Sequence, residues 1–211
     1  MTVSYKTLAK EANAGFIEKK SAFAGYGSPA KSEEVARAFI DKVRRANPQA
    51  NHVCYAYIIG TNIQRMSDAG EPSGTAGTPI LETLKTRGLT NCSAAVVRIF
   101  GGVLLGARGL ARAYGRACSM AIDACGVCVM EPTDRMEITI PYSLWDTLRH
   151  AMKGTPCEWA DVEYAADIRA TLRVRSADSE GVLDRLRDAS NGRITVAGKN
   201  TQHEPWNEVS G

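Results

Sequence analysis

The sequence lacks the features that are typical of membrane-spanning and secreted proteins. Its longest apolar runs, such as residues 94–97 and 103–105, are far shorter than the ~20 residues that a membrane-spanning helix needs. The first twelve residues contain no apolar signal core. Six cysteines in 211 residues are too few for a disulfide scaffold. The sequence therefore predicts a cytoplasmic protein with reduced thiols and no membrane partner.

The motifs of common enzyme and cofactor classes are missing as well. No lysine follows the glycines of residues 67–79 as in a Walker phosphate loop, and the sequence has neither a dinucleotide-binding fingerprint nor a nucleophile elbow. Cys125 and Cys128 have CxxC spacing, but Cys125 is predicted to end a helix, whereas redox motifs of this kind usually open one. A zinc site would need two more ligands, for which His52 and Cys54 are the only candidates. We therefore expect buried thiols, no metal, no cofactor and no catalytic residue.

The composition is that of a globular protein, with 44% hydrophobic, 23% charged and 7% aromatic residues. Charge is distributed unevenly along the chain. Residues 1–130 hold 16 Lys and Arg against 9 Asp and Glu, whereas residues 131–211 hold 10 against 14. The block of residues 83–122 contains six basic residues and no acidic one. Such a block favours an anionic partner, unless acids elsewhere in the fold neutralise it.

Hydrophobic periodicity predicts two α+β domains joined near residue 132. In the first, at residues 1–131, we expect helices at 33–46, 80–87 and 108–125, with Ser32 as the N-cap of the first, and strands at 16–26, 52–59, 63–66 and 92–100. In the second, at residues 132–200, the expected order is strand 135–140, helix 143–152, strands 157–164 and 167–174, helix 179–190 and strand 193–196. This βαββαβ order is that of a ferredoxin-like domain. Residues 201–211 are predicted to be a frayed polar tail.

The predicted helix at 108–125 carries an unusual charge pattern. Arg108, Arg112 and Arg116 follow one another at intervals of four residues, which destabilises an isolated helix by roughly 0.2–0.5 kcal/mol per pair. The opposite side is a stripe of small and apolar residues suited to close packing on a sheet, namely Leu110, Ala113, Tyr114, Ala117, Ala121 and Ala124. An anion such as a phosphate backbone would offset the repulsion. Acids of the second domain could do so instead.

A glycine-rich loop precedes the helix at 80–87. Glycines and hydroxyl side chains just before a helix can form an anion-binding nest. The two acids of this loop argue against a bound phosphate, and they could hold a cation or cap neighbouring turns. A rigid structural loop is an equally good interpretation. The residues of interest are Ser67, Asp68, Gly70, Glu71, Pro72, Ser73, Gly74, Thr75, Gly77 and Thr78.

Three segments together resemble the IMPACT/YigZ family, namely HVCYAY at residues 52–57, SDAGEPSGTAGTPIL at 67–81 and VVRIFGGVLLGARGLARAY at 96–114. The resemblance covers most of residues 16–130, and the second half resembles the smaller C-terminal domain of bacterial members. It implies a first domain similar to domain IV of elongation factor G, with a βαβ unit of left-handed crossover, and a second similar to domain V. It also implies a role near translation, because eukaryotic relatives regulate translation under amino-acid stress.

From these observations we expect a non-enzymatic, translation-linked protein that binds RNA or the ribosome. The expected contacts are Lys85, Arg87, Arg98, Arg108, Arg112 and Arg116. A first alternative is a regulator that docks on an acidic protein surface. A second is a small-molecule enzyme that uses the loop hydroxyls with Asp68 and Glu71, which requires a concave pocket at the loop.

Overall fold

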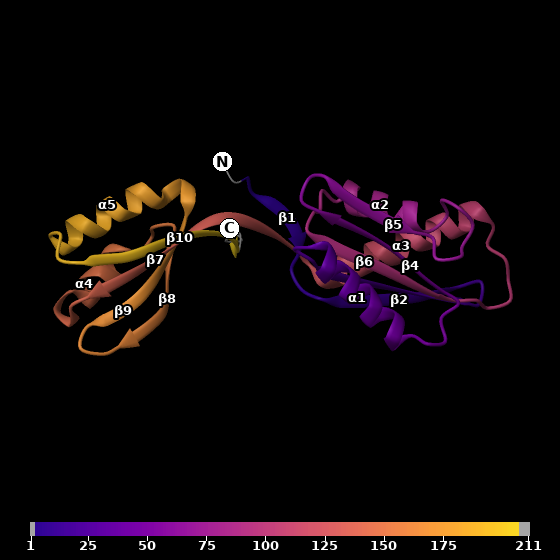
Figure 1. Ribbon diagram of the computed structural model, residues 1–211, viewed down its shortest axis with the longest axis horizontal. Helices are drawn as coiled ribbons and strands as arrows, with labels where there is room; N and C mark the ends of the chain where they lie inside the picture. The colour runs from indigo at the N-terminus through magenta and orange to yellow at the C-terminus, as the bar shows by residue number, and fades with distance from the viewer. Residues whose placement is uncertain (1–2, 207–211) are drawn as a thin grey trace. The chain divides into compact units, whose positions relative to one another are not determined.

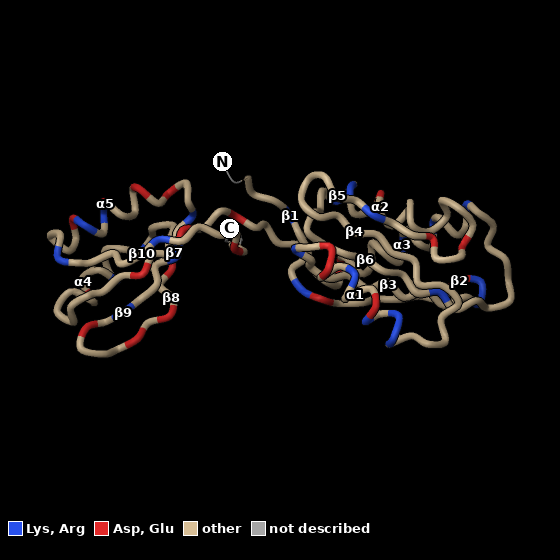
Figure 2. Tube along the Cα trace, in the orientation of Figure 1, with Lys and Arg blue, Asp and Glu red and all other residues tan. Residues whose placement is uncertain are grey.

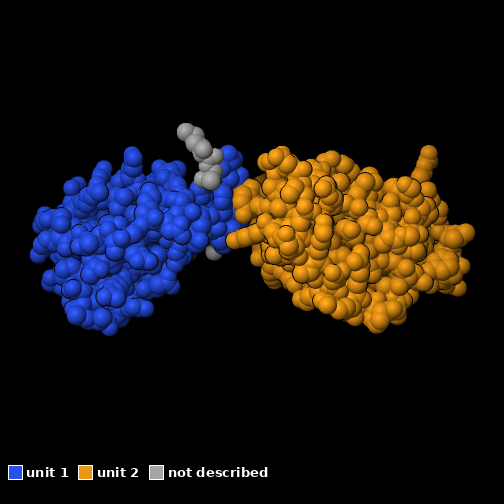
Figure 3. All heavy atoms as spheres, in the orientation of Figure 1, with its two compact units in different colours: residues 1–4, 130–211 blue, residues 5–129 orange. Residues whose placement is uncertain are grey.

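The computed structural model describes residues 3–206, which fold into two compact units (Figures 1 and 3). The first unit comprises residues 5–129, and the second comprises residues 130–206 together with residues 3 and 4. The division falls inside strand β7 (Val127–Ile140), which continues from one unit into the other. The protein is thus of mixed α+β class with two domains. None of the helices within residues 3–206 is long and apolar enough to cross a membrane.

The first unit is built on one antiparallel sheet with the strand order β2-β3-β6-β4-β5. Because β3 and β4 are each antiparallel to β6, they run parallel to each other on its two sides, and α1 joins them as a crossover. The elements are β1 (Tyr5–Leu8), β2 (Ala12–Glu18), β3 (Ser21–Pro29), α1 (Glu33–Ala46), β4 (His52–Ile59), β5 (Ile63–Ser67), α2 (Gly77–Thr86), β6 (Cys92–Ile99) and α3 (Ala107–Cys125).

Helices cover both faces of this sheet, α1 on one side and α2 with α3 on the other (Figure 1). Side chains of β6 alternate between the two cores: Ala94 and Val96 lie in the α2–α3 core, whereas Ala95 and Val97 lie in the α1 core. This double coverage explains why β6 is apolar along most of its length. Residues 100–106 link the end of β6 to the start of α3.

Small residues bring α3 close to the sheet, as the sequence pattern predicted. A Cβ atom at Gly25 of β3 would lie 2.1 Å from the Ala117 carbonyl oxygen and 3.1 Å from the Ala121 side chain. The α3 stripe faces inward: Ala113, Ala117 and Ala121 are all buried. The absence of bulk at these positions therefore serves packing.

The structure corrects the expected strand at 16–26, which is a hairpin of β2 and β3. The chain reverses at Lys19 and Lys20, whose φ angles of 45° and 65° lie in the left-handed region. Two-residue hairpin turns of this geometry normally contain Asn or Gly. The two lysines therefore gave no indication of a turn in the sequence. The helix expected at 80–87 also begins earlier, at Gly77.

The second unit has the predicted βαββαβ order. Its strands lie in the order β10-β7-β9-β8, which is the ferredoxin-like arrangement, and α4 and α5 pack on the sheet with a core that includes Met136, Leu148 and Leu172. The remaining elements are α4 (Tyr142–Ala151), β8 (Cys157–Tyr164), β9 (Ile168–Arg175), a short 3₁₀ turn (Ser176–Asp178), α5 (Ser179–Ser190) and β10 (Thr195–Trp206).

The expectation of a frayed tail from Thr201 is wrong as far as Trp206, because β10 continues to that residue. Trp206 is buried, and its indole N–H donates to Thr133 Oγ1 at 2.7 Å. The guanidinium groups of Arg173 and Arg175 lie over its ring, 5.3 and 4.8 Å from the centroid. Residues 207–211 of the expected tail lie outside the described residues.

Candidate functional site

Three arginines of α3, Arg108, Arg112 and Arg116, form what we call the basic ridge. All three are exposed, and within residues 5–129 no carboxylate forms an ion pair with any of them. Arg116 lies over the Phe16 ring, 4.2 Å from its centroid, which orients its guanidinium by a cation–π contact. Figure 2 marks the basic positions of the chain in blue. The ridge spans about 12 Å along the helix at 1.5 Å per residue.

Two further basic residues that the sequence analysis proposed already have partners on the surface. Lys85 Nζ lies 2.8 Å from Glu82 Oε1. Arg87 Nη2 donates to Asp123 Oδ1 at 2.9 Å and to the Ser119 hydroxyl at 2.8 Å. These exposed pairs contribute little to stability, but they reduce the positive potential of both side chains.

The expected phosphate contact at Arg98 is corrected by the structure, because Arg98 is only 5% exposed. Its Nη1 donates to Glu71 Oε1 at 2.6 Å, and its guanidinium lies over the rings of Phe23 and Phe100. Among residues 3–206 its Nε has no hydrogen-bond partner. A buried guanidinium cannot lie on an exposed phosphate-binding surface, so Arg98 does not belong to the basic ridge.

Glu71 is the centre of a buried polar cluster that joins the loop to the sheet and to α3. Its Oε1 accepts from both Arg98 Nη1 and the Tyr114 hydroxyl, the latter at 2.8 Å, and His52 Nε2 lies 3.9 Å away. Burial, and the neighbouring Cys54 and Glu71, raise the pKa of Tyr114 far above its ordinary value. Burial also raises the pKa of the Cys54 thiol to about 12. Both groups are therefore neutral at pH 7.

Asp68 organises the glycine-rich loop from within. Its Oδ1 accepts from the backbone N–H groups of Ala76 and Gly77, and its Oδ2 accepts from that of Gly74. Burial by itself would raise the pKa of Asp68, but these three hydrogen bonds outweigh it and hold the pKa below its ordinary value. The N–H groups that a phosphate would need are thus bound by the chain's own carboxylate.

Hydroxyl groups and glycines of the loop also have structural roles. Thr75 Oγ1 donates to the Pro72 carbonyl at 2.6 Å, and Ser67 Oγ accepts from the Ala69 N–H. Gly70 and Gly74 have φ angles of 90° and 76°, in the region that favours glycine. Of the other residues singled out in the sequence, Thr78 donates to a methionine sulfur, Gly77 lies against the Ser67 backbone, and Pro72 and Ser73 are exposed. Hydrogen bonds within the loop and the backbone conformations of its glycines therefore fix its shape.

A pocket of about 410 Å³ lies between this loop and the start of α3. Its polar wall comprises His52, Glu71 and Arg98. The apolar wall is formed by the segment that links β6 to α3, including Phe100 and Leu105. The sequence did not reveal the pocket because its walls come from three separate segments, within residues 51–52, 71–72 and 98–110. The only available signal was that the enzyme alternative required a concave pocket at the loop.

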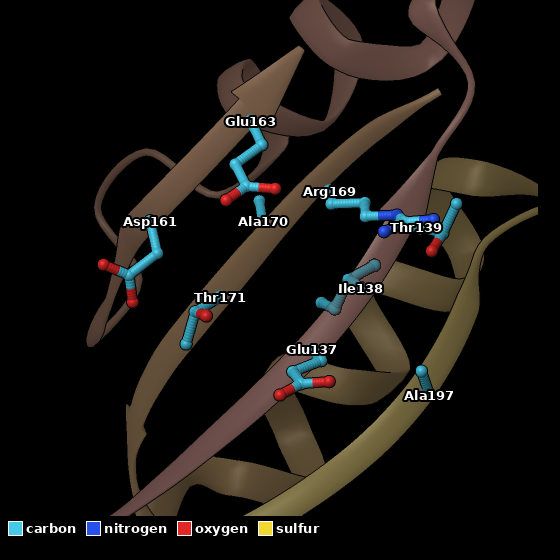
Figure 4. Close-up of a pocket in the computed structure, with 9 residues that line it drawn as sticks. All are labelled: Glu137, Ile138, Thr139, Asp161, Glu163, Arg169, Ala170, Thr171 and Ala197. Carbon is cyan, nitrogen blue, oxygen red and sulfur yellow. The ribbon is translucent and has the colours of Figure 1, made fainter. Parts of the chain in front are cut away.

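A second hollow, of about 440 Å³, lies on the sheet of the second unit (Figure 4). Glu137, Asp161, Glu163 and Arg169 contribute its charged groups, from three neighbouring strands. Asp161 is already paired with Arg135 at 2.6 Å. Among residues 3–206 no group of three or more His, Cys, Asp or Glu is arranged to hold a metal ion.

All six cysteines lie within residues 3–206 and are thiols rather than halves of disulfides. Cys125 is buried at the end of α3, and Cys128 is half-buried at the start of β7. Burial raises the pKa of both thiols, which disfavours the reactive thiolate.

Comparisons with known proteins cover both units. The family model "Impact N-terminal domain" matches residues 19–122, and "Domain of unknown function (DUF1949)" matches residues 138–193. The IMPACT family member YvyE of Bacillus subtilis is 32% identical over 198 residues, which are 93% of this chain and 91% of that protein. The IMPACT family member YigZ of Escherichia coli is 42% identical over 108 residues, 49% of this chain and 53% of that protein.

A solved structure described as that of a hypothetical protein is also similar. It has a TM-score of 0.62 and 28% identity, and the match covers 93% of this chain and 97% of that one. The matches extend over both units, and the three segments that carry the resemblance in the sequence lie in the first of them. The chain therefore belongs to the IMPACT/YigZ family.

Proposed function

We propose that this protein is a translation-linked regulatory protein of the cytoplasm that binds RNA or the ribosome through the basic ridge of α3. Family membership supports a translation regulator. The assignment of the binding surface is supported by the exposure of Arg108, Arg112 and Arg116, which have no acidic partner within residues 5–129. Because like charges at this spacing repel, an anionic partner stabilises the ridge.

The expected mode of binding follows from the chemistry of the ridge. Three guanidinium groups provide phosphate contacts, which position a nucleic acid without reading its sequence. The proposed likeness of the two units to domains IV and V of elongation factor G is consistent with a ribosomal site. The likeness implies a βαβ unit of left-handed crossover, and the α1 connection between the parallel strands β3 and β4 supports the βαβ part of it. The proposed role is non-enzymatic, because Asp68 and Glu71 are each engaged in structural contacts.

A partner protein with an acidic surface is the second candidate, and one observation favours it. The segment before the ridge exposes large apolar side chains: Leu104 is 81% exposed, Phe100 42% and Val103 38%. Apolar side chains beside a basic ridge suit an acidic protein surface better than they suit a phosphate backbone.

The test is a fluorescence anisotropy titration of ribosomal RNA, and of purified ribosomal subunits, against the full chain and a variant with all three ridge arginines changed to alanine. We expect the variant to bind more weakly. The negative slope of log K against log salt should also become shallower by about 2 to 3. The matched control changes three arginines of α1, on the other face of the sheet, namely Arg37, Arg44 and Arg45.

An equal loss in both triple variants would indicate a general charge effect and would overturn the assignment to the ridge. Unchanged affinity and salt slope in the ridge variant would overturn it as well. Capture of a protein that survives nuclease treatment, and that depends on the same three arginines, would favour the acidic-partner alternative.

A further inference from the structure

We propose that the basic ridge binds a single-stranded segment of RNA, and that one unpaired base of this segment stacks on the guanidinium group of Arg116. The inference rests on the proposed function, because it names the class of RNA that the same surface binds. It adds a contact with a base to the phosphate contacts described above. Two observations support it: the aromatic rings that lie beneath Arg116, and the exposure of the guanidinium above them.

A series of ring contacts leads from the core of the first unit to Arg116. The Phe23 ring is buried, and the edge of its contact with Tyr114 is T-shaped, with centroids 5.5 Å apart. The Phe16 ring stacks on Phe23 with centroids 5.5 Å apart and planes inclined by 14°. Phe16 is half-buried on the edge strand β2, which packs against α3. The Arg116 guanidinium lies over the Phe16 ring, 4.2 Å from its centroid. Phe16 is thus held by the core beneath an exposed arginine.

The contact with Phe16 orients Arg116 before a partner arrives. An exposed arginine has many rotamers, and fixing one of them on binding costs free energy. A guanidinium that rests on an aromatic ring is planar and already positioned, so less of this cost remains. Because the ring covers one face of the guanidinium, a partner meets the other face. Within residues 5–129 no carboxylate forms an ion pair with Arg116 that would compete for it.

An exposed planar cation of this kind suits an unpaired nucleobase. Bases that are splayed out of RNA loops, bulges and ends stack on aromatic side chains and on guanidinium planes of arginine. A base inside a duplex has stacked neighbours on both faces, so it cannot reach such a platform. Stacking tolerates every base, because each base has a π-face. The contact therefore selects unpaired RNA without reading its sequence.

The other two ridge arginines suit the phosphates of the same strand. Arg108, Arg112 and Arg116 follow one another at about 6 Å along the helix axis, which is comparable with the distance between successive phosphates of one nucleotide strand. Among the described residues no aromatic ring lies beneath Arg108 or Arg112. These two side chains keep their full freedom to follow a phosphate backbone, whereas Arg116 is fixed. We therefore expect one stacked base at Arg116 and phosphate contacts on the preceding turns.

The test compares two labelled oligomers by fluorescence anisotropy with the full chain. One contains about 12 unpaired adenosines, a length typical of single-strand binding sites. The other is an abasic oligomer with the same number of phosphates. Stacking of one base changes affinity by a factor of roughly five to 150, so we expect the adenosine oligomer to bind about tenfold more tightly. The two salt slopes should be equal, because both oligomers make the same phosphate contacts.

Three variants locate the stacked base. Arg116→Lys keeps the charge but removes the planar group, so it should reduce affinity for the adenosine oligomer to that for the abasic one. Phe16→Leu keeps an apolar side chain but removes the ring beneath Arg116, and it should lower the preference for adenosine. The matched control is Arg45→Lys, an exposed arginine of α1, which should retain the full preference. Circular dichroism checks that each variant is folded.

A spectroscopic signal reports the contact directly. In ¹H–¹⁵N spectra the Nε–H signal of Arg116 should shift with the adenosine oligomer, because the ring current of a stacked base acts on it. The abasic oligomer should leave that ring-current shift out.

Equal affinity for the two oligomers would overturn the inference and would leave the ridge as a surface for phosphates alone. An undiminished preference in Arg116→Lys or in Phe16→Leu, or an equal loss in Arg45→Lys, would overturn it as well. The proposed function fails on a different result, namely unchanged binding of ribosomal RNA when all three ridge arginines are alanine, so the two failures are distinguishable.

Discussion

The carboxylate of Asp68 is expected to stabilise the first unit by holding the glycine-rich loop, and Asp68→Asn tests this. The carboxylate accepts three backbone hydrogen bonds, from Gly74, Ala76 and Gly77. An asparagine can keep the two to Oδ1, but its amide NH₂ then faces the Gly74 N–H, donor against donor. A hydrogen bond to a charged group contributes about 1.5–3 kcal/mol, so we expect a loss of about 2 to 3 kcal/mol in the free energy of unfolding.

The assay separates the two units, because all three tryptophans of the chain, Trp145, Trp159 and Trp206, lie in the second. Urea unfolding followed by tryptophan fluorescence reports that unit, whereas far-ultraviolet circular dichroism reports both. Asp68→Asn should move the part of the dichroism transition that belongs to the first unit and leave the fluorescence midpoint unchanged.

The pH dependence gives the sign of the effect. The pKa of Asp68 in the folded protein lies below its ordinary value of 3.8, so its contribution is fully present above that value and is lost as the pH falls through the folded-state pKa. Asparagine does not titrate there, and the stability difference between the two proteins should shrink below about pH 4. An unchanged midpoint at pH 7, or a difference that stays constant into the acid range, would refute the reasoning.

Two further substitutions test the buried contacts of each unit. Glu71→Gln leaves Arg98 buried without its counter-charge, so we expect it to lower the free energy of unfolding of the first unit by about 3–5 kcal/mol. Urea unfolding followed by circular dichroism measures this loss, and adding Arg98→Met should recover part of it. A wild-type midpoint for Glu71→Gln would contradict the pairing. Trp206→Ala removes a buried indole and its hydrogen bond to Thr133, and it should lower the free energy of unfolding of the second unit by about 3 kcal/mol. The unfolding midpoint reported by the fluorescence of the two remaining tryptophans measures this loss. An unchanged midpoint would mean that the end of β10 is not part of the folded unit.

The spacing of apolar residues was sufficient to predict those helices and strands whose buried residues recur at regular intervals along one segment. The helix Glu33–Ala46 begins after Ser32, whose hydroxyl accepts from the Val35 N–H, as its capping residue and apolar spacing predicted. The helix Ser179–Ser190 and the strand Cys157–Tyr164 have the predicted bounds. The hairpin at Lys19 and Lys20 was missed because those residues are not typical of the turn they form.

The sequence by itself determined the class of the fold, the ferredoxin-like order of the second unit and the outward row of Arg108, Arg112 and Arg116, because helical and strand periodicity is a property of consecutive residues. Only the tertiary structure decided that Arg98 is buried, since its partner Glu71 lies 27 residues away and the Tyr114 hydroxyl reaches the same oxygen from α3. An arginine near the end of a strand can lie on a solvent-exposed surface or in a buried ion pair. The choice between them depends on which distant carboxylate the fold brings within hydrogen-bonding distance, and that contact leaves no trace in local spacing.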